Sequence, residues 1–200
     1  TDTPLVETPQ TVHVVPAWQV AETGARSLPD ALAYTPGVSQ TYGWTLRTGD
    51  QVQMRGFEIW NTLRDGMTYQ VNTYDGQQEP YGLERIEVLK GPGGSLYGAG
   101  AIGGLINQTS KRPQFEAGGE VTASYGTWNR KQFGLDVTGP LNDAGTLAGR
   151  VVFAARNSDT QTDYIQDNRF LIAPSLTWRA TEDTDITLLA RYQKDNGGSI

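Results

Sequence analysis

A glycine-rich segment is the first pattern in the sequence that could carry chemistry. Residues 98–103 read Gly-Ala-Gly-Ala-Ile-Gly and match the GxGxxG fingerprint of dinucleotide-binding sites. That fingerprint works only when a strand leads directly into the glycines and a helix follows them. Here a Gly-Pro-Gly-Gly stretch intervenes after Leu89, and residues 105–113 read as a strand that ends in proline. The sequence therefore gives no support to a dinucleotide site.

The remaining reactive residue types indicate neither catalysis nor a protein-bound metal. The chain has no cysteine and one histidine, His13, which removes thiol nucleophiles, cysteine-based zinc sites and a histidine-based cage or triad. Glu84 and Glu87 are close in sequence, but sequence spacing does not set the carboxylate separation that glycosidases need. We therefore expect no catalytic residue, no metal ligand and no intrinsic cofactor, and so a protein that is not an enzyme.

Composition narrows the class of protein further. The 16 basic and 22 acidic side chains give a net charge of −6, the opposite sign from most nucleic-acid binders. No segment approaches the run of about 18 apolar residues that a membrane-spanning helix requires. The 24 glycines and 10 prolines favour a turn-rich, strand-rich protein.

The N-terminal part, up to Pro113, reads as short elements joined by ordered loops. A helix is expected over 27–34, because Ser27 can cap it, Asp30 lies in its first turn and Thr-Pro-Gly at 35–37 ends it. Strands are expected at 11–15, 51–55, 63–64, 85–89 and 105–109.

After Pro113 the apolar residues alternate with polar ones. This pattern predicts strands at 120–125, 132–138, 147–154, 170–178 and 186–193. Two architectures fit it: a soluble antiparallel sheet with one wet face, or a membrane barrel with one face toward lipid. Aromatic residues near the segment ends, such as Tyr125 and Trp178, favour the barrel. Pro174 argues mildly against a regular central strand.

Six short motifs occur in an order that is typical of one family. They are 8–15, 28–38, Arg-Gly-Phe at 55–57, Asp-Gly-Met at 65–67, Leu-Glu-Arg-Ile-Glu-Val-Leu-Lys-Gly-Pro at 83–92, and the stretch from Ser-Leu-Tyr-Gly at 95–98 to Ser-Lys-Arg-Pro at 110–113. By these motifs the chain resembles TonB-dependent outer-membrane receptors. Within that family it resembles the ferric-siderophore receptors of the ferric-hydroxamate (ferrichrome) type.

The resemblance implies an outer-membrane β-barrel of about 22 antiparallel strands, with an N-terminal α+β plug domain in its lumen. Residues 1–113 would be the plug, and residues 114–200 would be the start of the transmembrane barrel. Because even the smallest such barrels use about eight strands, we expect the 200 residues to be part of a chain several times longer. The peptide that contacts TonB would precede Thr1.

The function implied by the resemblance is uptake. The receptor would bind a ferric siderophore outside the cell and import it to the periplasm with energy from the TonB complex. It would lie in the outer membrane of a Gram-negative bacterium, as a monomer surrounded by outer-membrane lipid, with no nucleic-acid partner. The alternatives are a TonB-dependent receptor for haem, cobalamin or a glycan, and a soluble all-β ligand-binding module.

The resemblance also suggests site residues. The apical loops would supply the ligand-binding residues Tyr42, Trp44, Arg47, Ile59, Trp60, Tyr69 and Tyr74, with local packing as the alternative for each aromatic residue. Plug–barrel contacts would involve Arg55 and Arg85, which would meet barrel glutamates beyond Ile200, together with Glu84 and Glu87. The alternative is that both arginines pair within the plug, with Glu58, Glu84 or Glu87.

The direction of the strands predicts which connections face outside. Residues 139–145 and 181–184 would form periplasmic turns, and residues 126–129 and 158–167 would face the outside. Asp159, Asp163 and Asp167 would then form a solvated acidic surface in one outer loop.

Overall fold

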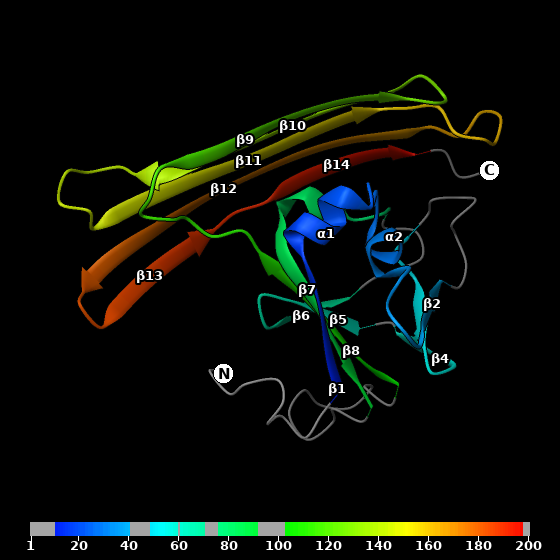
Figure 1. The fold of residues 1–200 in the computed structure, drawn as a ribbon, viewed down its shortest axis with the longest axis horizontal. Coiled ribbons are helices and arrows are strands. Elements are labelled where there is room, and N and C mark those ends of the chain that lie inside the picture. The colour runs from blue at the N-terminus through cyan, green and yellow to red at the C-terminus, as the bar shows by residue number, and fades with distance from the viewer. Residues whose placement is uncertain (1–10, 41–48, 60, 71–75, 92–102, 198–200) are drawn as a thin grey trace. The chain divides into compact units, whose positions relative to one another are not determined.

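The structure is a computed structural model that describes residues 11–40, 49–59, 61–70, 76–91 and 103–197 (Figure 1). Its contacts divide the chain into two compact units, Thr1–Ser110 and Lys111–Ile200. No helix among the described residues is long and apolar enough to cross a membrane.

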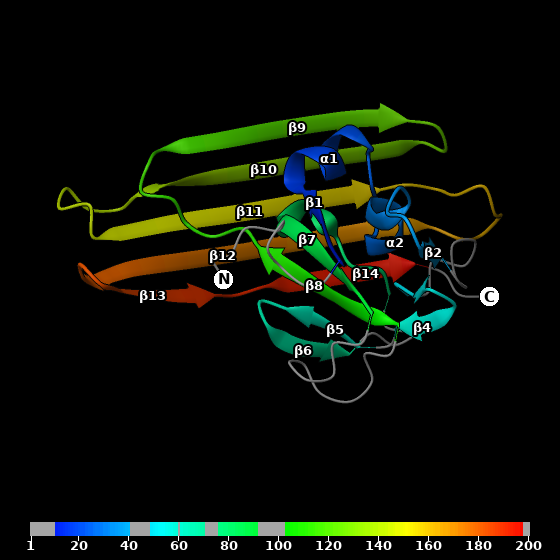
Figure 2. The same cartoon turned by 60° about the horizontal axis from the view of Figure 1, so that its bottom comes forward.

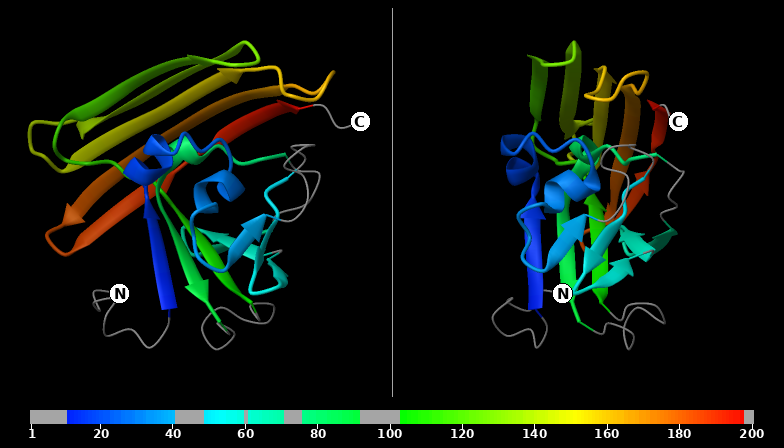
Figure 3. Two further views of the ribbon diagram at one scale, coloured as in Figure 1. Left: turned by 45° about the vertical axis from the view of Figure 1, so that its right-hand side comes forward. Right: turned by 90° about the vertical axis from the view of Figure 1, so that its right-hand side faces the viewer.

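In its described residues, the first unit combines two small sheets with three short helices. Its elements are β1 (Thr11–Pro16), α1 (Ala17–Glu22), α2 (Leu28–Leu32), β2 (Val38–Gln40), β3 (Val52–Met54), β4 (Phe57–Ile59), β5 (Asn61–Arg64), β6 (Met67–Gln70), the 3-10 helix η2 (Pro80–Gly82), β7 (Leu83–Lys90) and β8 (Gly104–Ser110). One sheet has the order β1-β7-β8-β5-β6, and the other has the order β2-β3-β4. β1, β7 and β8 lie side by side (Figure 3).

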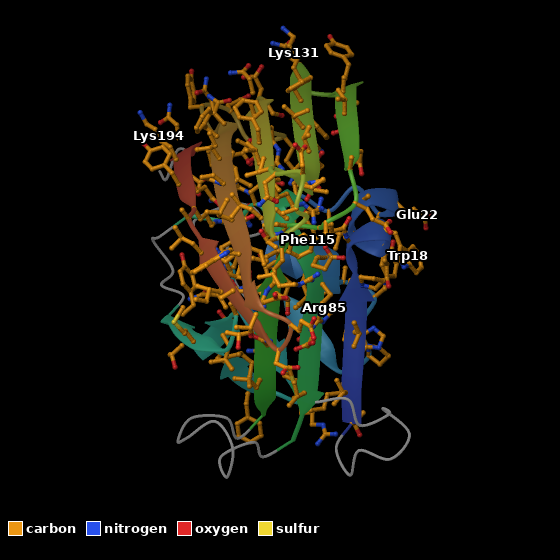
Figure 4. All side chains as sticks on the ribbon, turned by 90° about the vertical axis from the view of Figure 1, so that its left-hand side faces the viewer. Trp18, Glu22, Arg85, Phe115, Lys131 and Lys194 are labelled. Carbon is orange, nitrogen blue, oxygen red and sulfur yellow. The ribbon has the colours of Figure 1, made fainter. Side chains whose placement is uncertain are left out.

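The helix predicted over 27–34 is confirmed as the shorter α2. At the start of the helix, the Ser27 side chain accepts a hydrogen bond from the Asp30 backbone N–H (3.3 Å). After its end, the Thr35 N–H donates to the Leu32 carbonyl (2.8 Å). The sequence did not predict α1, which begins after Pro16 without a side-chain cap and has no acidic residue in its first turn. Trp18 and Glu22, one helical turn apart, project from one side of α1 (Figure 4).

A compact apolar core holds the first unit together. Its fully buried members come from both sheets and from α2, including Leu32, Met54, Ile86 and Ile106. Burial of each such side chain contributes roughly 1.5–3 kcal/mol. β5 and β6 meet in a two-residue turn at Asp65 and Gly66, both with positive φ (52° and 81°), which the Asp-Gly pair accommodates readily.

The second unit is an antiparallel sheet of long strands. They are β9 (Gly118–Gly126), β10 (Arg130–Pro140), β11 (Leu147–Asn157), β12 (Asp167–Thr181), β13 (Thr184–Leu189) and β14 (Tyr192–Gly197). Neighbours in sequence pair in a meander from β9 to β13, and β14 also pairs with β12. All five predicted strand regions are found in this sheet.

The fifth predicted segment is split in two, which corrects the expectation of one unbroken strand over 186–193. β13 and β14 lie end to end along β12 (Figure 2), and their partners show one continuous register: Leu189 faces Ser175 and Tyr192 faces Ile172. At the break, the Ala190 N–H donates to the Pro174 carbonyl (3.0 Å). Proline has no N–H to donate in return. The ladder is therefore interrupted opposite Pro174, while β12 itself continues through the proline.

Candidate functional site

Five of the seven predicted ligand-binding residues, Tyr42, Trp44, Arg47, Trp60 and Tyr74, lie outside the described residues. Ile59 ends β4 and is a core residue with 5% of its surface exposed. Tyr69 lies on β6 and is 41% exposed. The Arg64 guanidinium lies 5.0 Å from the centre of the Tyr69 ring, a cation–π distance.

Arg55 lies at the turn between β3 and β4. Arg55 and Gly56 both have positive φ (54° and 85°), and the Arg55 N–H donates to the Gly37 carbonyl (3.0 Å). Its side chain is exposed, and its guanidinium lies beside the backbone of Gly91. Within the described ranges it has neither an ion pair nor a side-chain hydrogen bond, so a partnership with Glu58 is not found there.

Arg85 on β7, in contrast, pairs within the first unit. Its Nε lies 2.7 Å from Glu87 Oε1, and Asn107 Nδ2 donates to the other oxygen of Glu87 (2.8 Å). Partial burial raises the pKa of the Glu87 carboxyl, but the hydrogen bonds from Asn107 and Arg85 outweigh it and leave the pKa below its usual value. Glu84 is exposed on the same strand.

Two stretches that are distant in sequence meet in the first unit. Gly49 forms a β-bridge with Gly76, and the Gln78 backbone N–H donates to Asp50 Oδ2 (2.6 Å). Asp50, Gln77 and Gln78 are all buried. We call Gly49, Asp50 and residues 76–78 the loop base. They directly follow residues 41–48 and 71–75, which contain most of the ligand-binding residues predicted for the apical loops.

Arg64 joins the loop base to the middle of β8. Its Nη2 donates to Gln78 Oε1 and to Gln108 Oε1, the latter at 2.8 Å. Gln108 is completely buried. Desolvation lowers the pKa of the Arg64 guanidinium, although the phenol of Tyr69 and the carboxylates of Asp65 and Asp50 oppose the shift.

Neither Arg64 nor Gln108 was among the residues that the sequence motifs singled out. One signal was available in the sequence, since Gln108 lies in phase with the apolar Ile106 on a predicted strand. A glutamine on an apolar face needs a buried partner.

The sheet of the second unit has exposed apolar side chains on one face and polar, ion-paired side chains on the other. Phe133 and Val137 of β10 are exposed, whereas Asp136 and Thr138 between and beside them are buried. On the apolar face an aromatic row crosses four strands, with ring centres 6.1 Å apart for Phe133–Phe153, 5.3 Å for Phe153–Phe170 and 6.3 Å for Phe170–Tyr192. This distribution is the reverse of a soluble sheet and is typical of a membrane barrel wall.

The polar face holds the segment that leads into the sheet. Asp136 accepts from Lys111 Nζ (2.8 Å) and from two nitrogens of Arg150 (2.7 Å each). Arg150 also donates to the Arg112 carbonyl (2.9 Å), and the Gln114 N–H donates to Thr138 Oγ1 (2.8 Å). We call these contacts the linker clamp.

A second polar cluster lies farther along the same face. Arg156 Nη1 lies 3.3 Å from Asp167 Oδ2, and Arg169 Nε lies 2.5 Å from Asp195 Oδ1. Asp167 begins β12 and is 5% exposed. The expectation that Asp167 belongs to a solvated acidic loop was therefore wrong. Its carboxylate is buried in the sheet, where it forms ion pairs with Arg156 and Arg169. Asp159 and Asp163 are exposed as expected.

Within the described ranges, no three His, Asp or Glu side chains form a group that could hold a metal ion.

Comparison with known proteins identifies the family. Residues 4–105 match the TonB-dependent receptor plug domain, about half of the chain. The chain belongs to this family. The resemblance inferred from the motifs is thereby confirmed: the chain covers the plug and part of the strands of an outer-membrane receptor barrel.

Named relatives of this receptor chain are siderophore receptors. The ferrioxamine B receptor of Salmonella typhimurium is 38% identical over 98% of this chain and 29% of its own length. The ferrichrome outer membrane transporter/phage receptor of Escherichia coli is 38% identical over 98% of this chain and 27% of its own length. The pyoverdine outer membrane receptor of Pseudomonas aeruginosa, solved with pyoverdine bound, has a TM-score of 0.85 and 30% identity, and the match covers 96% of this chain and 28% of that structure. The chain thus spans less than a third of the length of each of these relatives.

Proposed function

We propose that the protein containing this chain is a TonB-dependent receptor that binds a ferric siderophore outside the cell and imports it to the periplasm. The observation that carries the proposal is the 38% identity, over 98% of the chain, to a ferrioxamine B receptor and to a ferrichrome transporter. Both cargoes are ferric hydroxamates, so a hydroxamate chelate is the proposed ligand.

In this proposal the protein makes and breaks no bond of its cargo and needs no cofactor of its own. The siderophore holds the iron, and the TonB complex supplies the work that releases the cargo. Residues 1–113 act as the plug in the lumen, and residues 114–200 begin a monomeric barrel of about 22 strands surrounded by outer-membrane lipid. The exposed apolar face of the second unit, with its row of four aromatic rings, supports the lipid contact.

The proposed ligand site lies at the apical loops, with Tyr42, Trp44, Arg47, Ile59, Trp60, Tyr69 and Tyr74 as its contacts. The exposed ring of Tyr69 supports its assignment more than the buried side chain of Ile59 does. Arg55 and Arg85, with Glu84 and Glu87, are proposed to face the barrel wall. The guanidinium of Arg55, which is exposed and has no ion-pair partner among the described residues, supports its role most directly.

Tryptophan fluorescence of the full-length receptor in detergent tests this function. Titration with ferrichrome and with ferrioxamine B should give saturable quenching by at least one of them, weakened by Trp60→Ala. Haem, cobalamin and the iron-free chelates are the controls and should give none. Binding of haem or cobalamin without binding of either ferric hydroxamate would leave the plugged barrel in place and overturn the cargo.

A further inference from the structure

The loop base collects two stretches of chain at one place in the first unit. The Gly49–Gly76 bridge and the bond from the Gln78 N–H to Asp50 Oδ2 (2.6 Å) join residues that are 27 and 28 positions apart. Both contacts involve buried or half-buried groups. A displacement of either stretch at this point must therefore displace the other.

Arg64 extends this connection in two directions. Through Gln78 and Gln108 its guanidinium joins the loop base to the centre of β8, and its charge lies over the ring of Tyr69. The next residue, Asp65, accepts from the backbone N–H (2.9 Å) and the hydroxyl (2.7 Å) of Ser110, at the end of β8. Arg64 and Asp65, two successive residues, thus bind Gln108 and Ser110 in the second half of β8.

The chemistry of this cluster argues against a purely stabilising role. A buried guanidinium is held by two neutral amide oxygens, and within the described ranges Arg64 Nε, Gln78 Nε2 and Gln108 Nε2 have no hydrogen-bond partner. A partly satisfied buried network adds little net stability, because each unpaired buried polar group offsets part of what the hydrogen bonds contribute. The guanidinium instead sets the relative positions of three elements, because one planar group contacts the loop base, β8 and Tyr69 of β6.

We propose that Arg64 is a positioning residue for the ligand site: it holds the loop base and Tyr69 against β8, so that chelate binding and the order of β8 are thermodynamically coupled. This inference rests on the proposed function. Coupling requires reciprocity: if Arg64 transmits binding to β8, then loss of Arg64 must weaken binding and must also remove the effect of the ligand on β8.

The test compares wild-type full-length receptor with Arg64→Met, which keeps the apolar stem and removes the guanidinium. Three quantities are measured: affinity for ferrichrome and ferrioxamine B by tryptophan fluorescence, hydrogen exchange in β8 with and without saturating chelate, and the midpoint of thermal unfolding. We expect affinity to fall by about tenfold or more and ligand-induced protection of β8 to disappear. The midpoint should fall, because the buried oxygens of Gln78 and Gln108 lose their donor, but it should stay above the temperature of the binding assay. Arg64→Lys, which keeps the charge but not the planar fork, should retain part of the affinity.

The matched control is Arg26→Met, because Arg26 pairs with Asp30 at 3.3 Å on a half-exposed helix end; it should change neither affinity nor exchange. If Arg64→Met does not fold, Gln108→Met cuts the same link at β8 and should give the same two losses. If a folded variant binds the chelate with wild-type affinity, or retains ligand-induced protection of β8, the inference is wrong and the proposed function stands. If the wild type binds neither chelate, the proposed function fails and the inference falls with it.

Discussion

Glu87 is a carboxylate whose neighbours decide its titration. Arg85 and Asn107 each donate to one of its oxygens (2.7 and 2.8 Å), and together they outweigh the partial burial that would raise its pKa. A carboxyl group whose pKa is lowered by folding adds stability above its unfolded pKa, and that stability is lost as the pH falls through the folded value. Glu87 therefore stabilises the first unit at neutral pH and stops doing so in acid.

Glu87→Gln should remove this pH dependence. At about pH 7 the variant should unfold more easily than the wild type, by less than about 1 kcal/mol, because the pair is partly exposed. The difference should shrink toward zero below about pH 4, where the wild-type carboxyl also becomes protonated. Thermal unfolding of the full-length receptor in detergent at both pH values measures it, with the exposed Glu116→Gln as the control. A difference between wild type and Glu87→Gln that is the same at both pH values would contradict the assignment.

At the scale of elements, Pro174 sets the continuity of the strand beside β12. Because its carbonyl accepts from the Ala190 N–H (3.0 Å), its nitrogen faces the same neighbour, and only the missing N–H separates β13 from β14. A full ladder would add one hydrogen bond, worth about 0.5–1.5 kcal/mol. The proline in turn stabilises the folded protein by about 0.4–1 kcal/mol, because it reduces the conformational entropy of the unfolded chain. The two effects nearly cancel.

Pro174→Ala should therefore join β13 and β14 while leaving stability nearly unchanged. The new amide at position 174 should exchange its hydrogen slowly, as a ladder donor does, and exchange at Ala190 should slow with it. Hydrogen exchange of the full-length receptor in detergent measures this. Ser175→Ala, which alters the next residue and keeps every N–H, should change none of these rates. Fast exchange at position 174 would show that the break has another cause.

The sequence predicted those helices and strands whose formation is determined by a pattern of neighbouring residues. Period-two alternation predicted the long strands, and the Ser27 cap predicted α2. α1 escaped prediction because Pro16 offers no side-chain cap, and β2, β4 and β6 are too short for periodicity to mark. The contacts of Arg64 with Gln78 and Gln108 could not be predicted, because they join residues 14 and 44 positions apart and polar strand residues normally read as solvent-facing. The family motifs predicted which segments contain the ligand-binding residues, but they do not indicate the contacts of Arg64.

At the scale of the whole molecule, the linker clamp determines how the chain enters the barrel sheet. Lys111 and Asp136 are each more than nine-tenths buried as side chains, and Arg150 ties the same carboxylate to the Arg112 carbonyl. Charges buried in this way are little screened by salt, and removal of one partner leaves the others unpaired at a cost of about 3–5 kcal/mol. The clamp thus fixes the segment that follows Ser110 to β10 and β11.

Asp136→Asn should release this anchor without altering the strands. The amide is nearly isosteric but cannot neutralise two cations, so residues 111–115 should leave the sheet and become accessible. Trypsin cleavage after Lys111 in the full-length receptor, followed in detergent over time, should be about tenfold faster or more in the variant, since 3–5 kcal/mol far exceeds the roughly 1.4 kcal/mol that a tenfold change in open population requires. Asp183→Asn, at the exposed turn between β12 and β13, is the matched control and should be cleaved like the wild type. Equal resistance of Asp136→Asn and wild type would mean that the backbone bonds of Arg112 and Gln114 hold the segment by themselves.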